Sequence, residues 1–289
     1  MRIGITGTQG FVGGAVVKAL NAVKHDVVDL DPVVRQGIFW QGQTEDQALP
    51  ARLDWVLHFA ATTSIADGWR EPGNMYANNV GATICALEAA RRSGASIVFM
   101  SSYVYGRPLY NPIDEKHPVS ATNPYMGSKL AGEAIARQYS HLFSIPLVIL
   151  RVFNVYGFCL IQGRLICDLI VAARNRRPFV LNDPGPQRDY LFIDDFVRLL
   201  LLIITRTPTP VGTYNVGSGT GHSNLMVAET FKNIMGGAFA IHVDHQPRRG
   251  DIDLCVADTS LVQSTFDWKP QWSLVEGVKA IVQRVNLIS

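Results

Sequence analysis

Tyr125 and Lys129 stand four residues apart in a stretch whose apolar residues recur with helical spacing. On a helix this spacing puts both side chains on one face, about 5–6 Å apart at Cβ. A lysine ammonium beside a tyrosine hydroxyl favours the phenolate and lowers the tyrosine pKa from about 10. A phenolate can take the proton of an alcohol, so the pair indicates acid–base chemistry. The alternative is an exposed surface pair.

Two hydroxyls, those of Ser101 and Ser102, follow the apolar run Ser96–Met100, which predicts a buried strand. Ligands bind at the carboxyl ends of the strands in doubly wound sheets. Either serine therefore suits a position from which a hydroxyl holds the oxygen of a reacting alcohol.

Three glycines, Gly7, Gly10 and Gly13, follow the short apolar strand Arg2–Thr6, and Phe11–Val23 then has a helical pattern. A strand, a glycine turn and a helix N-terminus together form an anion site. The glycines let the backbone approach a pyrophosphate, and the N–H groups and the helix dipole favour its charge. The alternative is a βα turn that binds nothing.

Asp31 ends the second predicted strand, Val27–Leu30, about 20 residues after the glycine turn. A carboxylate there can accept both hydroxyls of an adenosine ribose and would repel a 2′-phosphate, which favours NAD over NADP. Arg35 argues the other way, because a guanidinium could hold that phosphate.

The predicted elements that must position these residues alternate along the chain. Further strands are expected at Trp55–Ala60, Ser96–Met100 and Leu147–Leu150, and further helices at Gly73–Ser93 and Tyr125–Ser144. This alternation indicates an α/β fold with a doubly wound parallel sheet of the Rossmann type. His58, inside a predicted strand, is expected to be a packed core histidine.

The texture changes after Arg151, where Pro, Gly and Asn become frequent. We therefore predict a Rossmann domain over 1–151 and a smaller C-terminal α/β substrate lobe over 152–289, with some segments returning to the Rossmann sheet. Helices of this part are expected at Leu165–Asn175, Asp194–Thr205, Asn224–Met235 and Leu274–Val285.

The composition excludes several classes of protein. The 289 residues are 47% hydrophobic, enough for a large core, and 26 Lys and Arg nearly balance 24 Asp and Glu, which argues against a nucleic-acid partner. No signal peptide is evident, and the longest apolar run, around Leu199–Ile204, is too short to span a membrane, so a cytoplasmic enzyme is expected. The four cysteines show no metal-binding spacing and are expected to be buried, reduced thiols. No metal site is predicted.

Several motifs occur together along the chain and make a resemblance plain. They are Thr6–Gly13 (TGxxGFxG), Asn78–Val80 (NNV), Ser101–Gly106 (SSxxVYG), Tyr125–Lys129 (YxxSK), Arg151–Gly157 (RxFNVYG), Arg188–Asp195 (RDxxxVDD), Tyr214–Gly217, Arg248–Asp251 and Ala257–Asp258. With these segments the chain resembles the NAD-dependent epimerase/dehydratase family of the extended short-chain dehydrogenase/reductases, which act on nucleotide sugars.

The resemblance implies a role for each matching residue. Ser101, Tyr125 and Lys129 would be catalytic; counting back from Val104-Tyr105-Gly106 selects Ser101, with Ser102 as the reserve. The NAD site would comprise Gly7, Gly10, Phe11, Val12, Gly13, Asp31, Phe59, Ala60, Ala61, Thr62, Thr63, Asn78, Tyr125, Lys129 and Phe153. The substrate site would comprise Ser101, Ser102, Asn154, Arg188 and Arg248, since guanidinium groups suit the oxygens of a nucleotide-sugar diphosphate.

Some positions depart from the family pattern. Ser102 and Tyr103 stand where dehydratases carry Asp-Glu, which argues against dehydration. Gly37–Arg52 lacks the usual acidic contact to adenine, for which Gln41 or Gln43 would substitute. Cys255 replaces an aromatic residue common in galactose-type epimerases, which leaves the sugar and the nucleotide open.

The reaction expected from the resemblance is epimerisation of a nucleotide sugar at C4 through a transient 4-keto intermediate, with NAD as cofactor. A 4-ketoreductase of a deoxysugar that consumes NAD(P)H, and a non-catalytic dinucleotide sensor, are the alternatives. A homodimer formed through the helices at Gly73–Ser93 and Tyr125–Ser144 is also expected.

Overall fold

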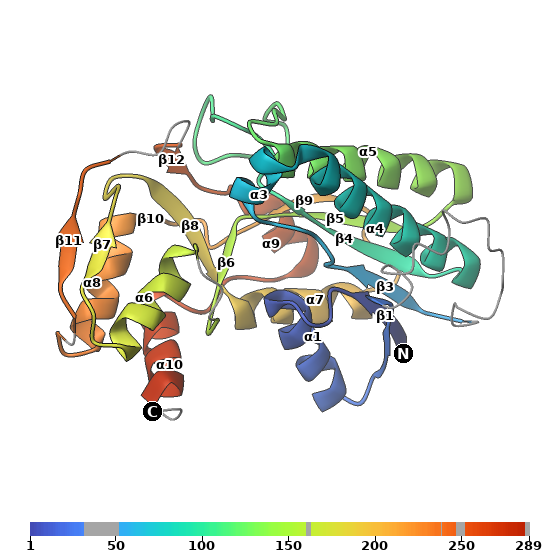
Figure 1. The fold of residues 1–289 in the computed structure, drawn as a ribbon. Helices are drawn as coiled ribbons and strands as arrows, with labels where there is room; N and C mark the ends of the chain where they lie inside the picture. The colour runs from blue at the N-terminus through green and yellow to red at the C-terminus, as the bar shows by residue number, and fades with distance from the viewer. Residues whose placement is uncertain (32–51, 160–162, 238, 247–251, 287–289) are drawn as a thin grey trace. The chain divides into compact units, whose positions relative to one another are not determined.

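The computed structural model describes residues 1–31, 52–159, 163–237, 239–246 and 252–286. The chain forms two compact units (Figure 1). The first contains residues 1–106, 118–152 and 197–214, and the second contains residues 107–117, 153–196 and 215–289. Each unit is therefore built from three separate stretches of the chain.

A parallel sheet forms the centre of the first unit. Its strands are β1 (Arg2–Thr6), β2 (Asp26–Asp29), β3 (Trp55–His58), β4 (Ser96–Ser102), β5 (Leu147–Val152) and β9 (Gly212–Val216). They lie in the order β2-β1-β3-β4-β5-β9, and the pairs β1–β2, β1–β3, β3–β4 and β4–β5 are parallel. The order reverses between β1 and β3, the kind of point at which α/β sheets bind ligands. This confirms the predicted doubly wound α/β fold.

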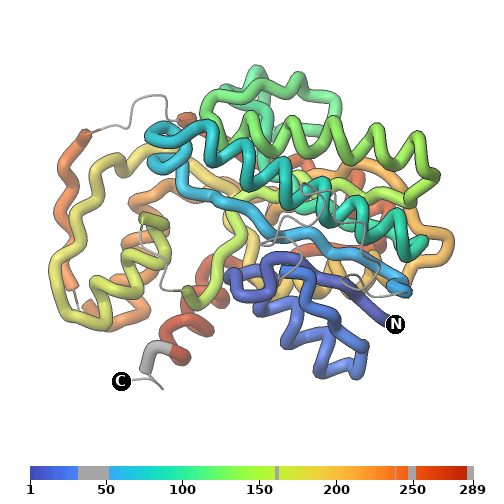
Figure 2. Tube along the Cα trace, turned by 45° about the vertical axis from the view of Figure 1, so that its right-hand side comes forward, coloured from blue at the N-terminus to red at the C-terminus, as the bar shows by residue number. Residues whose placement is uncertain are grey.

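Helices cover both faces of this sheet. They are α1 (Phe11–Ala22), α3 (Ile65–Arg70), α4 (Pro72–Ser93), α5 (Pro124–Phe143) and α7 (Ile193–Thr205), whose last nine residues belong to this unit. Helices α4 and α5 pack together on one face, and α1 lies on the other (Figures 1 and 2). The short α3 was not predicted; the Ser64 side chain caps it by accepting a hydrogen bond from the Asp67 N–H.

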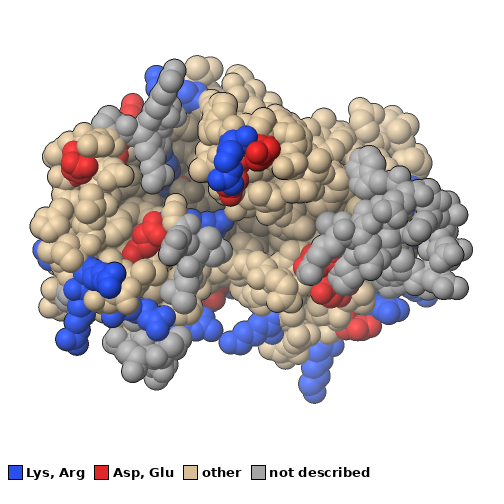
Figure 3. Space-filling model, in the orientation of Figure 1, with Lys and Arg blue, Asp and Glu red and all other residues tan. Residues whose placement is uncertain are grey.

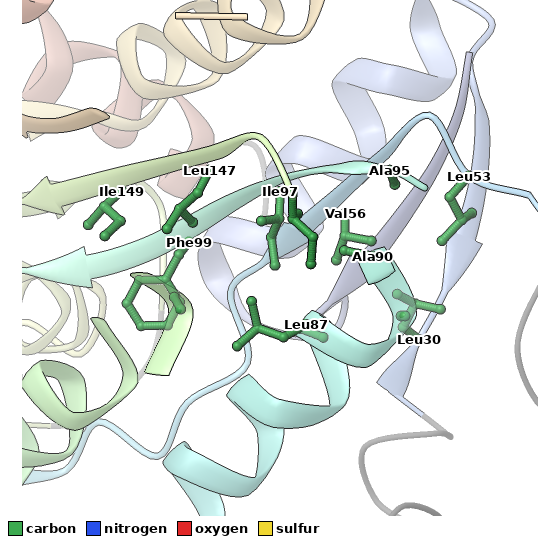
Figure 4. Close-up of a cluster of buried hydrophobic side chains, with 14 residues drawn as sticks. Leu30, Leu53, Val56, Leu87, Ala90, Ala95, Ile97, Phe99, Leu147 and Ile149 are labelled. Atoms are coloured by element: carbon green, nitrogen blue, oxygen red, sulfur yellow. The ribbon is translucent and has the colours of Figure 1, made fainter. Parts of the chain in front are cut away.

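One hydrophobic cluster of the first unit lies between the sheet and helices α4 and α5 (Figure 4). Leu87 from α4 and Phe99 from β4 are fully buried there. Phe99 also lies directly against α5, because a Cβ built on Gly132 would come within 2.8 Å of its ring. Close packing of this kind fixes the face of α5 that meets β4. The further side chains of this cluster that Figure 4 labels are Leu30, Leu53, Val56, Ala90, Ala95, Ile97, Leu147 and Ile149.

The second unit has its own small sheet. Strands β6 (Asn154–Tyr156), β8 (Gln187–Phe192), β10 (Gly221–Ser223) and β12 (Leu254–Cys255) form it, and β7 (Phe179–Leu181) pairs with β11 (Ile241–Val243). The helices are α6 (Leu165–Arg174), α8 (Asn224–Ile234), α9 (Ser260–Phe266) and α10 (Leu274–Asn286). Except for α9, these helices begin at the predicted residues and end within one residue of them.

The prediction that all four cysteines are reduced thiols is wrong for two of them. Cys159 and Cys167 form a disulfide with their Cα atoms 5.6 Å apart. The expectation was wrong because the fold brings together two cysteines that lie eight positions apart in the sequence, a spacing that signals neither a metal site nor a pairing. Cys85 and Cys255 are buried free thiols, as predicted.

Charged side chains of both signs occur on the surface of the molecule. Lys and Arg side chains are spread over the face in Figure 3, with Asp and Glu side chains between them. Within the described ranges, no helix is both long and apolar enough to cross a bilayer.

Candidate active site

The glycine turn has a backbone that other residues would not fit. Gly7 has φ +78°, and a Cβ at that position would lie 2.7 Å from the backbone nitrogen of Ala60. A Cβ on Gly13 would lie 2.0 Å from the Gly7 carbonyl oxygen. Helix α1 starts directly after this turn, at Phe11, with no side-chain cap at Gly10. The turn thus offers bare backbone and a helix N-terminus, the two features that suit a pyrophosphate.

Asp31 lies against this turn. Its carboxylate accepts hydrogen bonds from the Gly7 N–H at 2.5 Å, the Thr8 N–H at 3.0 Å and the Thr8 hydroxyl at 2.9 Å. The side chain therefore has a structural role at the turn, and its contact with a ribose stays a prediction. Arg35, the possible partner of a 2′-phosphate, lies outside the described residues.

The segment after β3 runs beside the glycine turn. The Thr6 hydroxyl accepts hydrogen bonds from the N–H groups of Phe59 and Ala60, both at 3.2 Å. The structure therefore brings these two predicted cofactor residues to the carboxyl ends of β1 and β3, next to Gly7. Ala61, Thr62 and Thr63 continue this segment.

Asn79 ties the same segment to the helix that carries Tyr125. Its side chain accepts from the Thr62 N–H at 2.7 Å, donates to the Thr62 carbonyl at 3.0 Å and donates to the Ser128 hydroxyl at 2.8 Å. Asn79 is buried, whereas its neighbour Asn78, the predicted cofactor contact, is exposed. The sequence analysis missed Asn79, although both residues belong to the NNV motif that it used.

Tyr125 and Lys129 lie in the first turns of α5. Asn123 caps this helix by accepting a hydrogen bond from the Met126 N–H at 2.9 Å. Tyr125 is half-buried, but Lys129 is only 4% exposed, and its Nζ lies 4.7 Å from the centre of the Phe99 ring. Burial lowers the pKa of Lys129 to about 8, against the opposing charge of Glu133. The aromatic face supports the ammonium form, so this lysine is a buried cation at neutral pH.

His58 is fully buried beside this lysine. Its Nδ1 lies 2.7 Å from the Thr6 hydroxyl and its Nε2 lies 3.2 Å from the Thr83 hydroxyl. Burial, with a smaller effect of the Lys129 charge, lowers its pKa to about 3. The imidazole is therefore neutral, which confirms the prediction of a packed core histidine.

Ser101 and Ser102 end β4, but their hydroxyls have different surroundings. The Ser101 hydroxyl donates to the Glu133 carboxylate at 2.6 Å, and Ser101 is 2% exposed. Ser102 is 8% exposed. The glutamate, which the sequence analysis missed, follows Lys129 by one helical turn, so the helical spacing alone could have signalled it.

Glu133 is a fully buried carboxylate with three further hydrogen bonds. Arg151 donates to it through Nε at 3.0 Å and Nη2 at 2.8 Å, and Arg137 donates at 2.9 Å. Burial by itself would raise the pKa of Glu133, but the bonds and charge of Arg151, with the bonds of Ser101 and Arg137, hold it below its usual value. The carboxylate is therefore ionised and paired.

The predicted substrate residues that the structure describes in the second unit come from adjacent strands. Asn154 on β6 and Arg188 on β8 belong to the same sheet, and Cys255 on β12 pairs with Arg188. The Arg188 guanidinium donates to the carbonyl oxygens of Gln187, at 2.9 Å, and Ile252. Phe153, directly before β6, is 6% exposed. Arg248 lies outside the described residues.

Comparison with known proteins gives a consistent result. A profile of the NAD dependent epimerase/dehydratase family matches residues 3–217. The UDP-glucose 4-epimerase of Lacticaseibacillus casei is 30% identical to this chain over 315 aligned positions, which cover 96% of this chain and 94% of the relative.

Two solved structures share the fold. The UDP-glucose 4-epimerase of Thermotoga maritima with UDP-glucose matches with a TM-score of 0.87 at 23% identity, covering 100% of this chain and 99% of that chain. The UDP-glucuronic acid 4-epimerase of Bacillus cereus in complex with UDP-glucuronic acid and NAD matches with a TM-score of 0.86 at 24% identity, covering 100% of both chains.

Proposed function

Because the chain belongs to the NAD dependent epimerase/dehydratase family, within the extended short-chain dehydrogenase/reductases, we propose that it epimerises a nucleotide sugar at C4. It is an NAD-dependent enzyme, as the resemblance predicted. The observation that carries the proposal is the buried ammonium of Lys129, one helical turn from Tyr125.

The glycine turn fits NAD, because a Cβ at Gly7 or Gly13 would collide with neighbouring backbone, so the tight turn that suits a pyrophosphate needs glycine at both positions. The residues that would hold the dinucleotide are this turn, Asp31 and the segment of residues 59–63. When bound, NAD would supply the acceptor for a hydride from the sugar carbon and the donor for its return. Asp31 favours NAD over NADP, since a 2′-phosphate would meet its carboxylate.

Tyr125 acts as the base in this proposal. Its phenolate takes the proton of the C4 hydroxyl, and the same group returns the proton once the ketone has presented its other face. The Lys129 ammonium stabilises the phenolate. A serine hydroxyl at the end of β4 holds the C4 oxygen. We propose a diphosphate-linked sugar as substrate, held by Asn154, Arg188 and Arg248.

The test is a panel of UDP-, GDP-, dTDP- and CDP-sugars incubated with the purified chain and NAD, and followed by NMR at the anomeric proton. We expect a UDP-hexose to reach an equilibrium with its C4 epimer, because relatives named UDP-glucose 4-epimerase match nearly the whole chain. The cofactor should show no net reduction.

Two other results would reject epimerisation in favour of the alternatives. Stoichiometric consumption of NAD(P)H with a 4-keto sugar, and no epimer, would identify a ketoreductase. Binding of NAD with no turnover of any sugar in the panel would favour a dinucleotide sensor.

We also propose that the protein is cytoplasmic and forms a homodimer through α4 and α5. These helices pack against each other and expose the apolar side chains of Tyr76, Leu142 and Phe143. Light scattering should give twice the mass of the chain, and a monomer at micromolar concentration would contradict it.

A further inference from the structure

The two serines at the end of β4 face opposite sides of the sheet. Phe99 and Ser101 point toward α5, since the Phe99 ring lies against Lys129 and the Ser101 hydroxyl bonds Glu133. Side chains alternate along a strand, so Ser102 points the other way. The two hydroxyls at the carboxyl end of β4 therefore have different surroundings.

The Ser101 hydroxyl has a buried partner. It donates at 2.6 Å to Glu133, which is 0% exposed and also accepts two hydrogen bonds from Arg151. A hydroxyl donates only one hydrogen bond, so this one cannot also donate to a sugar oxygen without breaking the bond to the glutamate. Losing it would leave a buried carboxylate oxygen with one donor fewer.

The position of Glu133 on α5 also places Ser101 away from Tyr125. The glutamate follows the tyrosine by eight residues, about 12 Å along a helix axis. Strands β4 and β5 are parallel and α5 connects them, so α5 runs back from the carboxyl edge of the sheet. Each step along β4 toward that edge therefore approaches Tyr125, and Ser102 is the last residue of the strand.

The hydroxyl of Ser102 is available for a ligand. Among the residues that the structure describes, no hydrogen bond joins this hydroxyl to another group, and Ser102 is 8% exposed.

The length of the motif explains why the sequence favoured Ser101 over Ser102. Ser101–Gly106 is one residue shorter than SSxxVYG, so counting back from Gly106 and counting forward along the strand select different serines.

We propose that Ser102 supplies the catalytic hydroxyl that holds the C4 oxygen. Ser101 is then a positioning residue, whose hydrogen bond holds the Glu133 carboxylate one helical turn from Lys129. The first half of this assignment rests on the proposed function. The second half concerns the fold of the first unit alone.

The test compares Ser102→Ala with Ser101→Ala, using UDP-glucose and NAD. Ser102→Ala should lower kcat on the order of 100-fold, as loss of one donor to a reacting oxygen does, with the same melting temperature. Ser102→Thr should restore most of kcat because it keeps a hydroxyl. Ser101→Ala should lower the melting temperature by several degrees and kcat by less than tenfold.

The pH profile separates positioning from general destabilisation. Ser101→Ala should shift the alkaline limb of kcat to lower pH, because Glu133, which supports the charge of Lys129, is held less firmly. Ser101→Thr should return the limb to its original place. Ser102→Ala should lower kcat at every pH without moving the limb.

The assignment is overturned if Ser101→Ala loses 100-fold in kcat while Ser102→Ala stays within tenfold. If the wild-type protein turns over no sugar, the proposed function fails, but thermal unfolding still tests Ser101. If Ser102→Ala lowers the melting temperature as much as Ser101→Ala does, or more, the positioning role of Ser101 is refuted.

Discussion

Both units bury charged groups, but they treat them differently. In the second unit, the Asp189 carboxylate is 0% exposed and accepts hydrogen bonds from the Ser218 N–H and hydroxyl, the Gly219 N–H and the Ala257 N–H. In the first unit, Lys129 is buried with no ion pair among the residues described, and burial lowers its pKa to about 8.

The difference separates a structural charge from a reactive one. Asp189 joins three segments of the second unit, and its hydrogen bonds oppose the rise in pKa that burial causes. Lys129 lies against a ring face, with a glutamate one helical turn away and a neutral histidine beside it, so its charge acts on whatever binds beside Tyr125. Active sites commonly keep such destabilised groups, which cost stability and supply reactivity.

The largest effect expected is on catalysis. Tyr125→Phe removes the proposed base and should lower kcat about 1000-fold, within the range of a positioned acid–base group. The affinity for NAD, measured by calorimetry, should stay within a few fold. Tyr139→Phe makes the same change farther along α5 and should leave kcat near that of the wild type. Equal losses in both variants would contradict the role of Tyr125.

Asp189→Asn should be the most destabilising change in the second unit. The amide replaces one carboxylate oxygen and faces donors that then lack an acceptor, at a cost of about 3 kcal/mol in the free energy of unfolding. Urea unfolding measures this effect. Asp244→Asn, on an exposed aspartate of the same unit, is the control and should change the free energy by under about 0.5 kcal/mol.

Lys129→Met should change the free energy of unfolding in the opposite direction to Asp189→Asn. It should raise stability and abolish turnover. The folded-state pKa, about 8, lies below the ordinary lysine pKa of 10.5, so the folded protein disfavours the ammonium by roughly 3 kcal/mol. This cost is fully present below pH 8 and disappears as the pH rises to 10.5. Urea unfolding at pH 7 and at pH 10.5 should show the gain only at pH 7.

The control for that comparison is Lys18→Met, which changes an exposed lysine of α1. It should leave stability nearly unchanged at both pH values. A loss of stability in Lys129→Met at pH 7 would show that the ammonium is not a destabilising charge, and the contrast with Asp189 would fail.

The buried, neutral His58 should cause a smaller loss of folding stability in acid. Its folded-state pKa, about 3, lies below 6.5, so stability is unaffected above pH 6.5 and is lost as the pH falls from 6.5 toward 3. At pH 5 the loss should be about 2 kcal/mol. His58→Gln should remove this part of the acid dependence, whereas His141→Gln, on an exposed histidine, should retain it.

Local patterns were enough to predict much of the first unit. The strand Arg2–Thr6, the glycine turn and α1 are adjacent in the sequence, and Tyr125 and Lys129 share a face because helical spacing alone requires it. Sequence motifs also identified the family, which the comparisons confirmed. Where the boundaries differed, they did so by one or two residues, because the ends of strands and helices depend on their neighbours.

Only the tertiary structure decided which groups are buried together. The contacts of Ser101 with Glu133, and of Glu133 with Arg151, join residues 32 and 18 positions apart, and no local period predicts them. The same holds for Asn79 with Ser128 and for the disulfide of Cys159 with Cys167. Burial lowers the pKa of Lys129. The packing of α5 on one face of β4 gives Ser101 and Ser102 different surroundings. The sequence thus determined the reactive residue types and their local spacing, while long-range packing determined their environment.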